Sequence, residues 1–301
     1  MHTPRGSKVV LGIGDDAAAW RPSRSHLSVI TTDALVENVH FTRAQAAFDE
    51  IGHRALAANL SDVAAMGARP VLATIAIGVP RGLAPEAIVE LYRGVDRLAR
   101  RAKIEIAGGD IVRAQELFVS ITVVGEVSAT SLKARSGARI GDVAAVTGAL
   151  GASRAALESK TRAELPEPRI AEGMWLAHSR NVHALMDLSD GLSTDLRRMA
   201  TASGCGAIIE EVPVAQSARV YAESIGEDSA RFAADGGEDF ELLAAIQARA
   251  FAYLSVRFKK RFGRPLLRVG AFRKEPGAAI RIGGQEQPLA AGGWDHLGSA
   301  P

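Results

Sequence analysis

The sequence contains a single cysteine and no long apolar run, and both absences narrow the class of protein. Cys205 alone among 301 residues excludes an intrachain disulfide framework and a metal cluster built from cysteines. No apolar run approaches the roughly 20 residues that span a bilayer. Residues 1–8 hold no apolar signal core, so we expect a cytoplasmic protein that does not enter a membrane.

An excess of one sign of charge is also missing. The 36 basic and 34 acidic residues give a formal net charge of +2, which offers no case for a nucleic-acid partner or an anionic membrane surface. The sequence lacks a P-loop, the His-Arg-Asp and Asp-Phe-Gly motifs of protein kinases, and the Gly-x-Ser-x-Gly motif of hydrolases. An ATP-using enzyme with this sequence therefore belongs to neither common nucleotide-binding type.

What the sequence does contain is a repeated association of acidic residues with glycine or a hydroxyl beside short apolar runs. In the clearest case the run 184–186 predicts a buried strand, Asp187, Ser189 and Asp190 follow it, and an amphipathic helix begins after Gly191. Two carboxylates three residues apart suit Mg²⁺, which prefers hard oxygen ligands. The alternative is that these side chains cap the helix.

The same association recurs along the chain. Acidic residues stand beside other predicted strands or within a helix at Asp16, Asp33, Asp62, Asp110 and Glu238 with Asp239. Carboxylates that converge on one site need cations to stay ionised together, so we expect several Mg²⁺ ions, and Mg²⁺ at this density indicates phosphate chemistry. The glycine pairs at 108–109 and 236–237 allow backbone N–H groups to approach phosphates closely. The competing interpretation is a collection of turns and caps, in which Asp and Gly are common.

The apolar periodicity predicts an α/β protein. The predicted helices are 49–66 (capped by Asp49), 85–102, 152–158, 169–178, 215–223 and 249–262. The predicted strands are 9–13, 27–30, 71–77, 104–107, 117–125, 143–146, 184–186, 207–210, 240–246 and 266–270, with a hairpin over 279–288. The polar, glycine-bearing stretch 128–142 predicts a boundary, with domains over 1–130 and 131–301.

Taken in order, these motifs resemble those of thiamine-monophosphate kinases, in the superfamily of aminoimidazole ribonucleotide synthetase and selenophosphate synthetase. The segments that carry the resemblance are 12–16, 31–33, 39–41, 57–68, 108–110, 135–137, 187–192 and 236–239. Each motif is short, but their order covers nearly the whole chain, from about residue 9 to residue 297.

The resemblance implies an N-terminal α/β domain that binds ATP and Mg²⁺ and contributes to a β-barrel across a homodimer. It implies a C-terminal α+β domain with a mixed sheet that completes the active site. The implied reaction is direct in-line transfer of the ATP γ-phosphoryl group to thiamine phosphate. The implied Mg²⁺ ligands are Asp16, Asp33, Asp62, Asp110, Asp187 and Asp190; the ATP contacts are Thr31, Thr32, Gly109, Arg135 and Ser189; the substrate contacts are His40, Glu238 and Trp294. No dedicated general base is implied, because a phosphate acceptor is already ionised.

Three positions depart from the pattern of the family that the sequence resembles. Ile111 and Val112 stand where two threonines are usual, and Ala102 stands where an aromatic residue is frequent. These departures keep two alternatives open. The chain could be an ATP-dependent kinase or synthetase of the same superfamily that acts on another small phosphate ester, or a non-catalytic nucleotide-binding paralogue.

Overall fold

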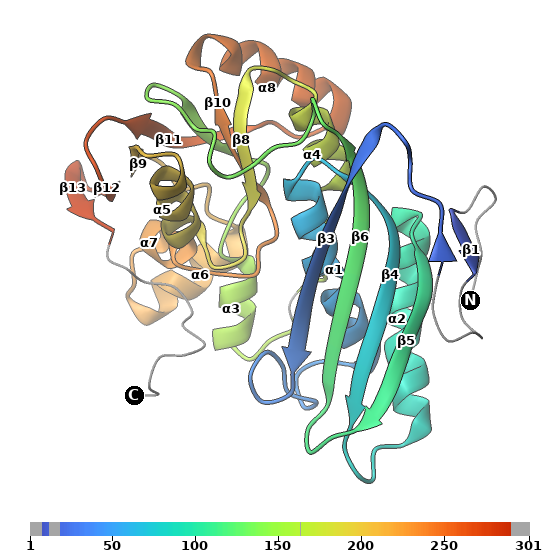
Figure 1. Ribbon diagram of the computed structural model, residues 1–301. Coiled ribbons are helices and arrows are strands. Elements are labelled where there is room, and N and C mark those ends of the chain that lie inside the picture. Colours follow the sequence, from blue (N-terminus) through green and yellow to red (C-terminus); the bar gives the residue numbers. More distant parts are fainter. Residues whose placement is uncertain (1–7, 12–18, 163, 290–301) are drawn as a thin grey trace. The chain divides into compact units, whose positions relative to one another are not determined.

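The computed structural model describes residues 8–11, 19–162 and 164–289, which divide into two compact units (Figure 1). The N-terminal unit contains the described residues up to Leu132 together with residues 165–174. The C-terminal unit contains the described residues of 133–164 and those from Trp175 onward. The N-terminal unit therefore includes a segment from the second half of the chain.

The N-terminal unit is a four-stranded sheet with two helices on one face (Figure 1). The strand order is β3-β6-β4-β5; β4 and β5 are parallel, and the other neighbours are antiparallel. The elements are β3 (His26–Val36), α1 (Phe48–Ala65), β4 (Arg69–Val79), α2 (Pro85–Ala102), β5 (Glu105–Arg113) and β6 (Phe118–Ser128), with a separate pair β1 (Val9–Leu11) and β2 (Ala19–Trp20).

The alternation of side chains along β4 explains why the helices cover one face. Ile75 and Ile77 point to the face covered by the helices and are fully buried there. Leu56 of α1 is fully buried in the same core. The opposite face carries small or polar residues such as Thr32, and Ile30 there is 73% exposed. This second face of the sheet has no helix over it in the described chain (Figure 1).

Two details of the N-terminal unit differ from the sequence-based expectations. Asp49 does not cap α1, whose N-cap is Ala47; the Asp49 carboxylate instead accepts a hydrogen bond from Arg97 of α2 at 2.6 Å. β3 and β5 are also longer than predicted, so Asp33 and Asp110 lie within strands and not after them. β3 pairs with β6 over its whole length, and these backbone hydrogen bonds keep the polar residues of β3 in an extended strand.

The C-terminal unit is built on a seven-stranded mixed sheet of order β13-β12-β9-β11-β7-β10-β8. Its strands are β7 (Val143–Val146), β8 (Val182–Asp187), β9 (Gly206–Ile209), β10 (Leu242–Ile246), β11 (Leu267–Arg273), β12 (Ala278–Ile282) and β13 (Gln285–Pro288). Its helices are α3 (Ala152–Glu158), α5 (Leu192–Ala202), α6 (Gln216–Ile225), α7 (Ser229–Ala234) and α8 (Ala248–Phe262), while α4 (Ile170–Ala177) begins in the N-terminal unit. The predicted α/β class and mixed C-terminal sheet are confirmed.

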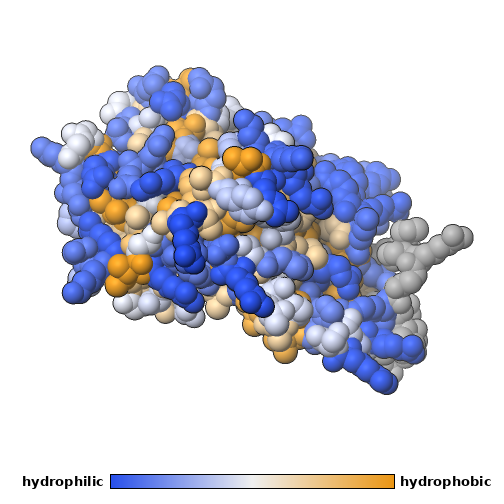
Figure 2. Space-filling model, turned by 90° about the horizontal axis from the view of Figure 1, so that it is seen from above, coloured by the Kyte–Doolittle hydropathy of each residue, from blue (hydrophilic) through white to orange (hydrophobic). Residues whose placement is uncertain are grey.

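Polar residues predominate on the face of the molecule shown in Figure 2, where apolar residues form only small separate areas. Among the helices of the described chain, none combines the length and the apolar character needed to cross a bilayer.

Candidate active site

The N-terminal unit brings three of the predicted site residues together. Thr31 and Asp33 are two positions apart on β3, so both side chains point to the same face of the sheet, the one covered by α1. The Thr31 hydroxyl donates a hydrogen bond to Oδ2 of Asp62 on α1 at 2.5 Å. Asp33 interacts with the same carboxyl group.

The proximity of Asp33 and Asp62 favours a bound cation. Burial, the negative charge of Asp62 and a hydrogen bond between the two carboxyl groups raise the pKa of Asp33 to about 6. One turn before Asp62, the buried Oδ1 of Asn59 has no hydrogen-bond partner among the described residues. A hard divalent cation would relieve the repulsion and take oxygen ligands, so the donor set at this position fits Mg²⁺.

Two predicted ATP or metal contacts lie at the other edge of the same sheet. Gly109 and Asp110 are on β5, three strand positions from β3, which corresponds to roughly 14 Å at the usual spacing. A Cβ atom at position 109 would lie 2.1 Å from the carbonyl oxygen of Ile75, so only glycine fits there. The Asp110 carboxylate accepts a hydrogen bond from the N–H of Ile111 at 2.8 Å.

Thr32 and His40 have structural partners. Thr32 points to the opposite face of the sheet from Thr31, where its hydroxyl accepts a hydrogen bond from Thr122 at 3.0 Å and donates one to the Ile121 carbonyl oxygen at 3.2 Å. Nδ1 of His40 accepts a hydrogen bond from the Val36 N–H at 3.0 Å, so this nitrogen fixes the ring beside the end of β3. A substrate contact by His40 therefore falls to the rest of the ring.

In the C-terminal unit, the predicted residues Asp187, Ser189 and Asp190 occupy the connection from β8 to α5. Asp187 is buried at the end of β8, whereas Ser189 and Asp190 are partly exposed. The N-cap residue of α5 is Gly191, so none of the three occupies the N-cap position. The structure therefore differs from the interpretation in which Ser or Asp of this motif is the N-cap.

Two residues that the sequence reasoning missed hold Asp190 in place. Arg198 forms an ion pair with the Asp190 carboxylate and contacts Asp195 Oδ1 at 3.2 Å. Asp195 is fully buried and accepts a hydrogen bond from the Asp190 N–H at 3.0 Å. Burial and the neighbouring charge of Asp190 raise the pKa of Asp195 to about 6.

The segment containing Glu238 is attached to this connection by backbone hydrogen bonds. The N–H of Glu238 donates to the Ser189 carbonyl oxygen at 2.8 Å, and the N–H of Phe240 donates to that of Leu188 at 3.0 Å. Glu238 and Phe240 both have positive φ, +60° and +50°, an unfavourable conformation for residues with side chains. Such strain accumulates where neighbouring structure requires a particular geometry, often at functional sites.

Asp239 has a structural role. Its carboxylate accepts a hydrogen bond from the Gly151 N–H at 2.8 Å, at the N-terminus of α3. Burial raises the pKa of Asp239 to about 7, although the backbone donors of residues 151–153 oppose this shift. Asp239 therefore serves the structure of this motif, and the substrate contact by Glu238 stays a prediction.

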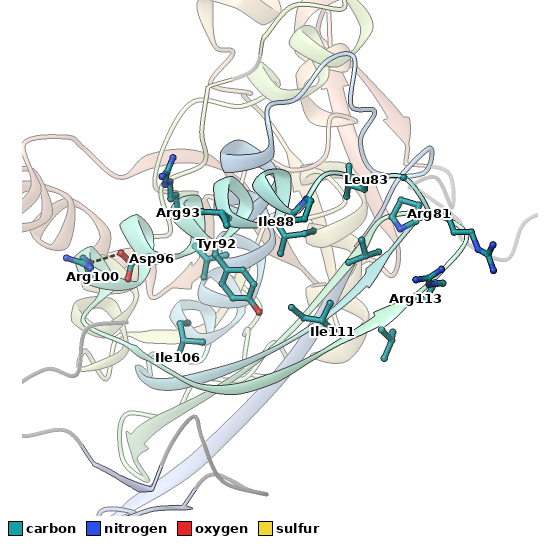
Figure 3. A pocket seen from close by; sticks show the side chains of 17 residues that line it. Arg81, Leu83, Ile88, Tyr92, Arg93, Asp96, Arg100, Ile106, Ile111 and Arg113 are labelled. Atoms are coloured by element: carbon teal, nitrogen blue, oxygen red, sulfur yellow. Dashed lines mark hydrogen bonds and ion pairs between the residues drawn. The ribbon is translucent and has the colours of Figure 1, made fainter.

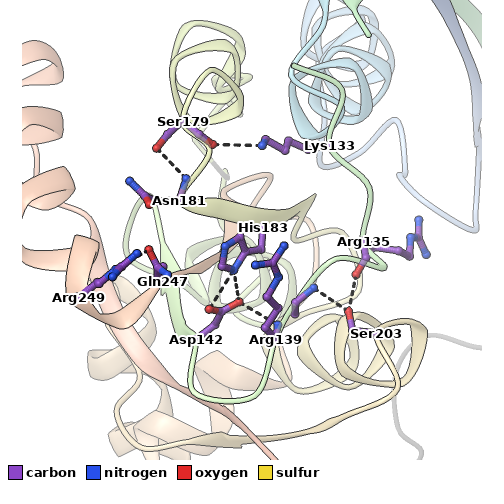
Figure 4. A network of polar contacts seen from close by, with 11 residues as sticks. Lys133, Arg135, Arg139, Asp142, Ser179, Asn181, His183, Ser203, Gln247 and Arg249 are labelled. Carbon is purple, nitrogen blue, oxygen red and sulfur yellow. Dashed lines mark hydrogen bonds and ion pairs between the residues drawn. The ribbon is translucent and has the colours of Figure 1, made fainter. Parts of the chain in front are cut away.

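The remaining predicted residues are less constrained. Arg135 is exposed; its carbonyl oxygen accepts a hydrogen bond from the Ser203 hydroxyl at 3.1 Å, and its side chain extends away from this contact (Figure 4). Asp16 and Trp294 lie outside the described residues. Within the described ranges, no group of three or more His, Cys, Asp or Glu side chains is arranged to hold one metal ion.

Gly191 sets the geometry of the connection that bears Asp190. Its φ is +101°, and a Cβ atom there would lie 2.7 Å from the Gly236 carbonyl oxygen. We therefore expect Gly191→Ala to lower the free energy of unfolding by about 1–3 kcal/mol, from backbone strain and the enforced shift of residue 236. Urea denaturation would measure this loss in the free energy of unfolding. Gly204→Ala is the control for φ alone, because Gly204 has φ +68° with nothing within 4 Å of the added Cβ atom. Equal losses in the two variants would contradict a specific role of the Gly236 contact.

A cavity of about 980 Å³ lies between α2 and β5 (Figure 3). Its walls are mainly apolar and include Ile88 and Tyr92 of α2 and Ile106 and Ile111 of β5. Its lining also includes four arginines, at positions 81, 93, 100 and 113, of which Arg100 pairs with Asp96 at 2.8 Å. An apolar slot lined with cations at its edges suits a planar ring system with an anionic group.

Comparison with known proteins assigns the class and then the family. A family model for the N-terminal domain of AIR synthase related proteins matches residues 14–127, and one for the C-terminal domain matches residues 138–251. The fold and the order of its two domains are those of AIR synthase related proteins. Thiamine-monophosphate kinase from Rhodopirellula baltica is 37% identical over 273 residues, which cover 87% of this chain and 83% of that protein. The chain belongs to the thiamine-monophosphate kinase family.

Solved structures agree with this assignment. Thiamine-monophosphate kinase from Stenotrophomonas maltophilia K279a has a TM-score of 0.83 at 33% identity, with 92% of each chain covered. AaThiL complexed with AMPPCP and TMP has a TM-score of 0.79 at 30% identity and covers 95% of this chain and 92% of its own.

Proposed function

We propose that this protein transfers the γ-phosphoryl group of ATP to thiamine phosphate and releases thiamine diphosphate and ADP. The observation that carries the proposal is the similarity, over 95% of this chain, to AaThiL complexed with AMPPCP and TMP. AMPPCP has the shape of ATP but cannot transfer its terminal phosphoryl group. Its presence beside TMP corresponds to the two substrates of this reaction.

The chemistry requires positioning and charge neutralisation more than proton transfer. An oxygen of the thiamine phosphate attacks the γ-phosphorus in line with the bond to the β–γ bridging oxygen, and that bond breaks as ADP leaves. The attacking oxygen is already anionic, so a site rich in aspartate and poor in candidate bases is adequate.

Several Mg²⁺ ions would be held by Asp33 with Asp62 and by Asp187 with Asp190, and Asp110 and Asp16 are further expected ligands. Bound there, Mg²⁺ would neutralise the charge on the transferred phosphoryl group. In this proposal the N-terminal domain supplies ATP contacts that include Thr31 and Gly109, whereas Thr32 points to the other face of the sheet. In the C-terminal domain the expected contacts are Arg135 and Ser189 for ATP and Glu238 and Trp294 for the acceptor. His40 is the expected acceptor contact of the N-terminal domain.

The cavity between α2 and β5 is the proposed position of the ATP base. Its wall residue Ile111 directly follows the expected ATP-contact segment Gly109–Asp110 on β5. In this arrangement Ile111 packs on the ring, so an apolar residue there is compatible with ATP binding.

A negative charge at position 111 tests whether the cavity binds the base of ATP. We expect Ile111→Glu to raise the KM for ATP by about tenfold or more, because a carboxylate in an apolar slot must be desolvated and repels the phosphates. Ile111 is exposed, so the variant is expected to fold. Val220→Glu on α6 is the matched control, since Val220 is 57% exposed and Ile111 is 56% exposed. Steady-state kinetics with an unchanged KM for ATP in Ile111→Glu would place the base elsewhere.

The uncovered face of the N-terminal sheet supports a homodimer. This face includes the exposed Ile30 and the bonded pair Thr32 and Thr122, and a sheet with one bare face is commonly covered by another layer. A second copy of the same sheet would supply that layer and, with it, the β-barrel expected across the dimer. Sedimentation velocity is expected to give about twice the chain mass, and a monomer at micromolar concentration would contradict the dimer.

The reaction is tested by ADP release from ATP and Mg²⁺, with and without thiamine phosphate, with the product identified by mass. ADP release that depends on thiamine phosphate, together with thiamine diphosphate, is the expected result. ATP binding without acceptor-dependent release would contradict the proposal and direct a screen of other phosphate esters.

A further inference from the structure

The guanidinium group of Arg198 contacts two carboxylates near the start of α5. Arg198 pairs with Asp190 and also contacts Asp195, and Asp195 in turn accepts the backbone N–H of Asp190. The three residues form a closed set of contacts in which Asp190, an expected Mg²⁺ ligand, already has a positive partner. None of the sequence motifs assigns a role to Arg198 or Asp195.

The three side chains differ in their freedom to move. Asp195 is fully buried, so its carboxylate is fixed and requires compensation of its charge. The Arg198 side chain is 41% exposed and that of Asp190 is 25% exposed. The guanidinium can therefore leave Asp190 through solvent while it remains beside Asp195.

We propose that Arg198 is a positioning residue. Its guanidinium pairs with the Asp190 carboxylate in the absence of metal and is displaced from it when Mg²⁺ binds Asp190. This inference rests on the assignment of Asp190 as a metal ligand in the proposed function. Before the metal binds, Arg198 holds Asp190 in one orientation and offsets its charge. Afterwards Asp195 retains the guanidinium next to the site, where its planar N–H donors are available to a phosphate oxygen.

The arrangement has a measurable consequence in the absence of nucleotide. Because Arg198 competes with the metal for Asp190, its removal should tighten metal binding. A residue with a merely structural role would have the opposite effect or none, since loss of a support loosens a ligand. The direction of the change in metal affinity therefore separates the two roles.

The test is titration of the nucleotide-free protein with Mn²⁺, which accepts the same oxygen ligands, followed by electron paramagnetic resonance of the free ion. In Arg198→Gln we expect the Kd of the Asp190-dependent site to fall about fivefold, the range of a partly exposed ion pair. Arg198→Lys, which keeps a cation without the planar fork, should give an intermediate Kd. The KM for ATP should rise in Arg198→Gln, because a phosphate donor is lost.

Two further variants make the result decisive. Arg268→Gln removes the same charge from a surface pair with Glu210 at 2.9 Å and should leave the Mn²⁺ Kd unchanged. Asp190→Asn should lose one Mn²⁺ site; if its titration matches that of the unmodified protein, the metal assignment itself fails. If Asp190→Asn loses the site but Arg198→Gln binds Mn²⁺ equally or more weakly, the competition by Arg198 is overturned while the proposed function stands.

Discussion

Asp190→Asn is expected to reduce turnover roughly a thousandfold while the fold remains intact. Loss of a carboxylate ligand displaces a metal that is worth several kcal/mol of transition-state stabilisation, and each 1.4 kcal/mol corresponds to about a factor of ten. Asparagine has nearly the same shape as aspartate, so packing around the partly exposed side chain is preserved. Acceptor-dependent ADP release at saturating ATP measures the effect.

The stability of this variant should change little. The substitution removes the ion pair with Arg198, but it also removes the charge that raises the pKa of Asp195. Asp49→Asn is a suitable control, since it makes the same chemical change at the surface pair with Arg97 and should retain full activity. Near-normal activity in folded Asp190→Asn would remove Asp190 from the metal site.

Asp33→Asn is expected to stabilise the metal-free protein and at the same time to remove most of the activity. In the folded chain, burial and the charge of Asp62 raise the pKa of Asp33 to about 6 from the ordinary value of 3.8. The folded state therefore binds more protons than the unfolded state between these values. The stability of the metal-free protein falls as pH rises through this window, and the full penalty is present above about pH 6.

The size of this stabilisation is limited by solvent. A shift of about two pKa units corresponds to roughly 3 kcal/mol, but solvent still reaches part of the Asp33 side chain and screens much of this energy, so we expect about 1 kcal/mol at pH 7.5. Thermal unfolding in the presence of a chelator, measured from pH 4 to pH 8, should show that Asp33→Asn becomes more stable than the unmodified protein as the pH rises from about 4 to about 6. Added Mg²⁺ should stabilise the unmodified protein more than the variant. Parallel stability curves for the two proteins would contradict the carboxylate pair.

Helix ends were more predictable than strand ends, for physical reasons visible in particular residues. α2 runs from Pro85 to Ala102 as predicted, because proline suits the first helical turn. α3 also has its predicted bounds. The strand β5 was predicted to stop before Gly108 because glycine and aspartate are rare in strands, yet its parallel pairing with β4 continues to Arg113.

The candidate site was predictable in composition more than in arrangement. Sequence patterns singled out Asp33 and Asp62, and the structure places them together. The sequence patterns do not show that Asp110 lies at the opposite edge of the sheet from Asp33. The order of the strands is set by pairing between segments that are distant in the sequence. The sequence pattern places Asp239 beside Glu238 among the acidic residues near predicted strands, but only the fold reveals that its carboxylate accepts a hydrogen bond from the Gly151 N–H.

The position of Asp195 on its helix is a further sequence signal for this site. It lies on the helical face defined by Leu192, Leu196 and Met199, all fully buried. A carboxylate on such a face must have a charged or hydrogen-bonding partner, and Arg198 is in reach one turn later. Helical periodicity applied to charged residues, and not only to apolar ones, would have identified the pair.

The hydrogen bonds from Glu238 to Ser189 and from Phe240 to Leu188 have a mechanical consequence. They join the segment proposed to contact the acceptor to the segment proposed to bind Mg²⁺, so the two cannot open independently. Local unfolding that exposes one set of amides to exchange must expose the other, and the two segments behave as one cooperative element. A mutation that loosens the acceptor side would therefore also loosen the metal side, and adaptation to a new acceptor in this protein would require compensating changes in both segments.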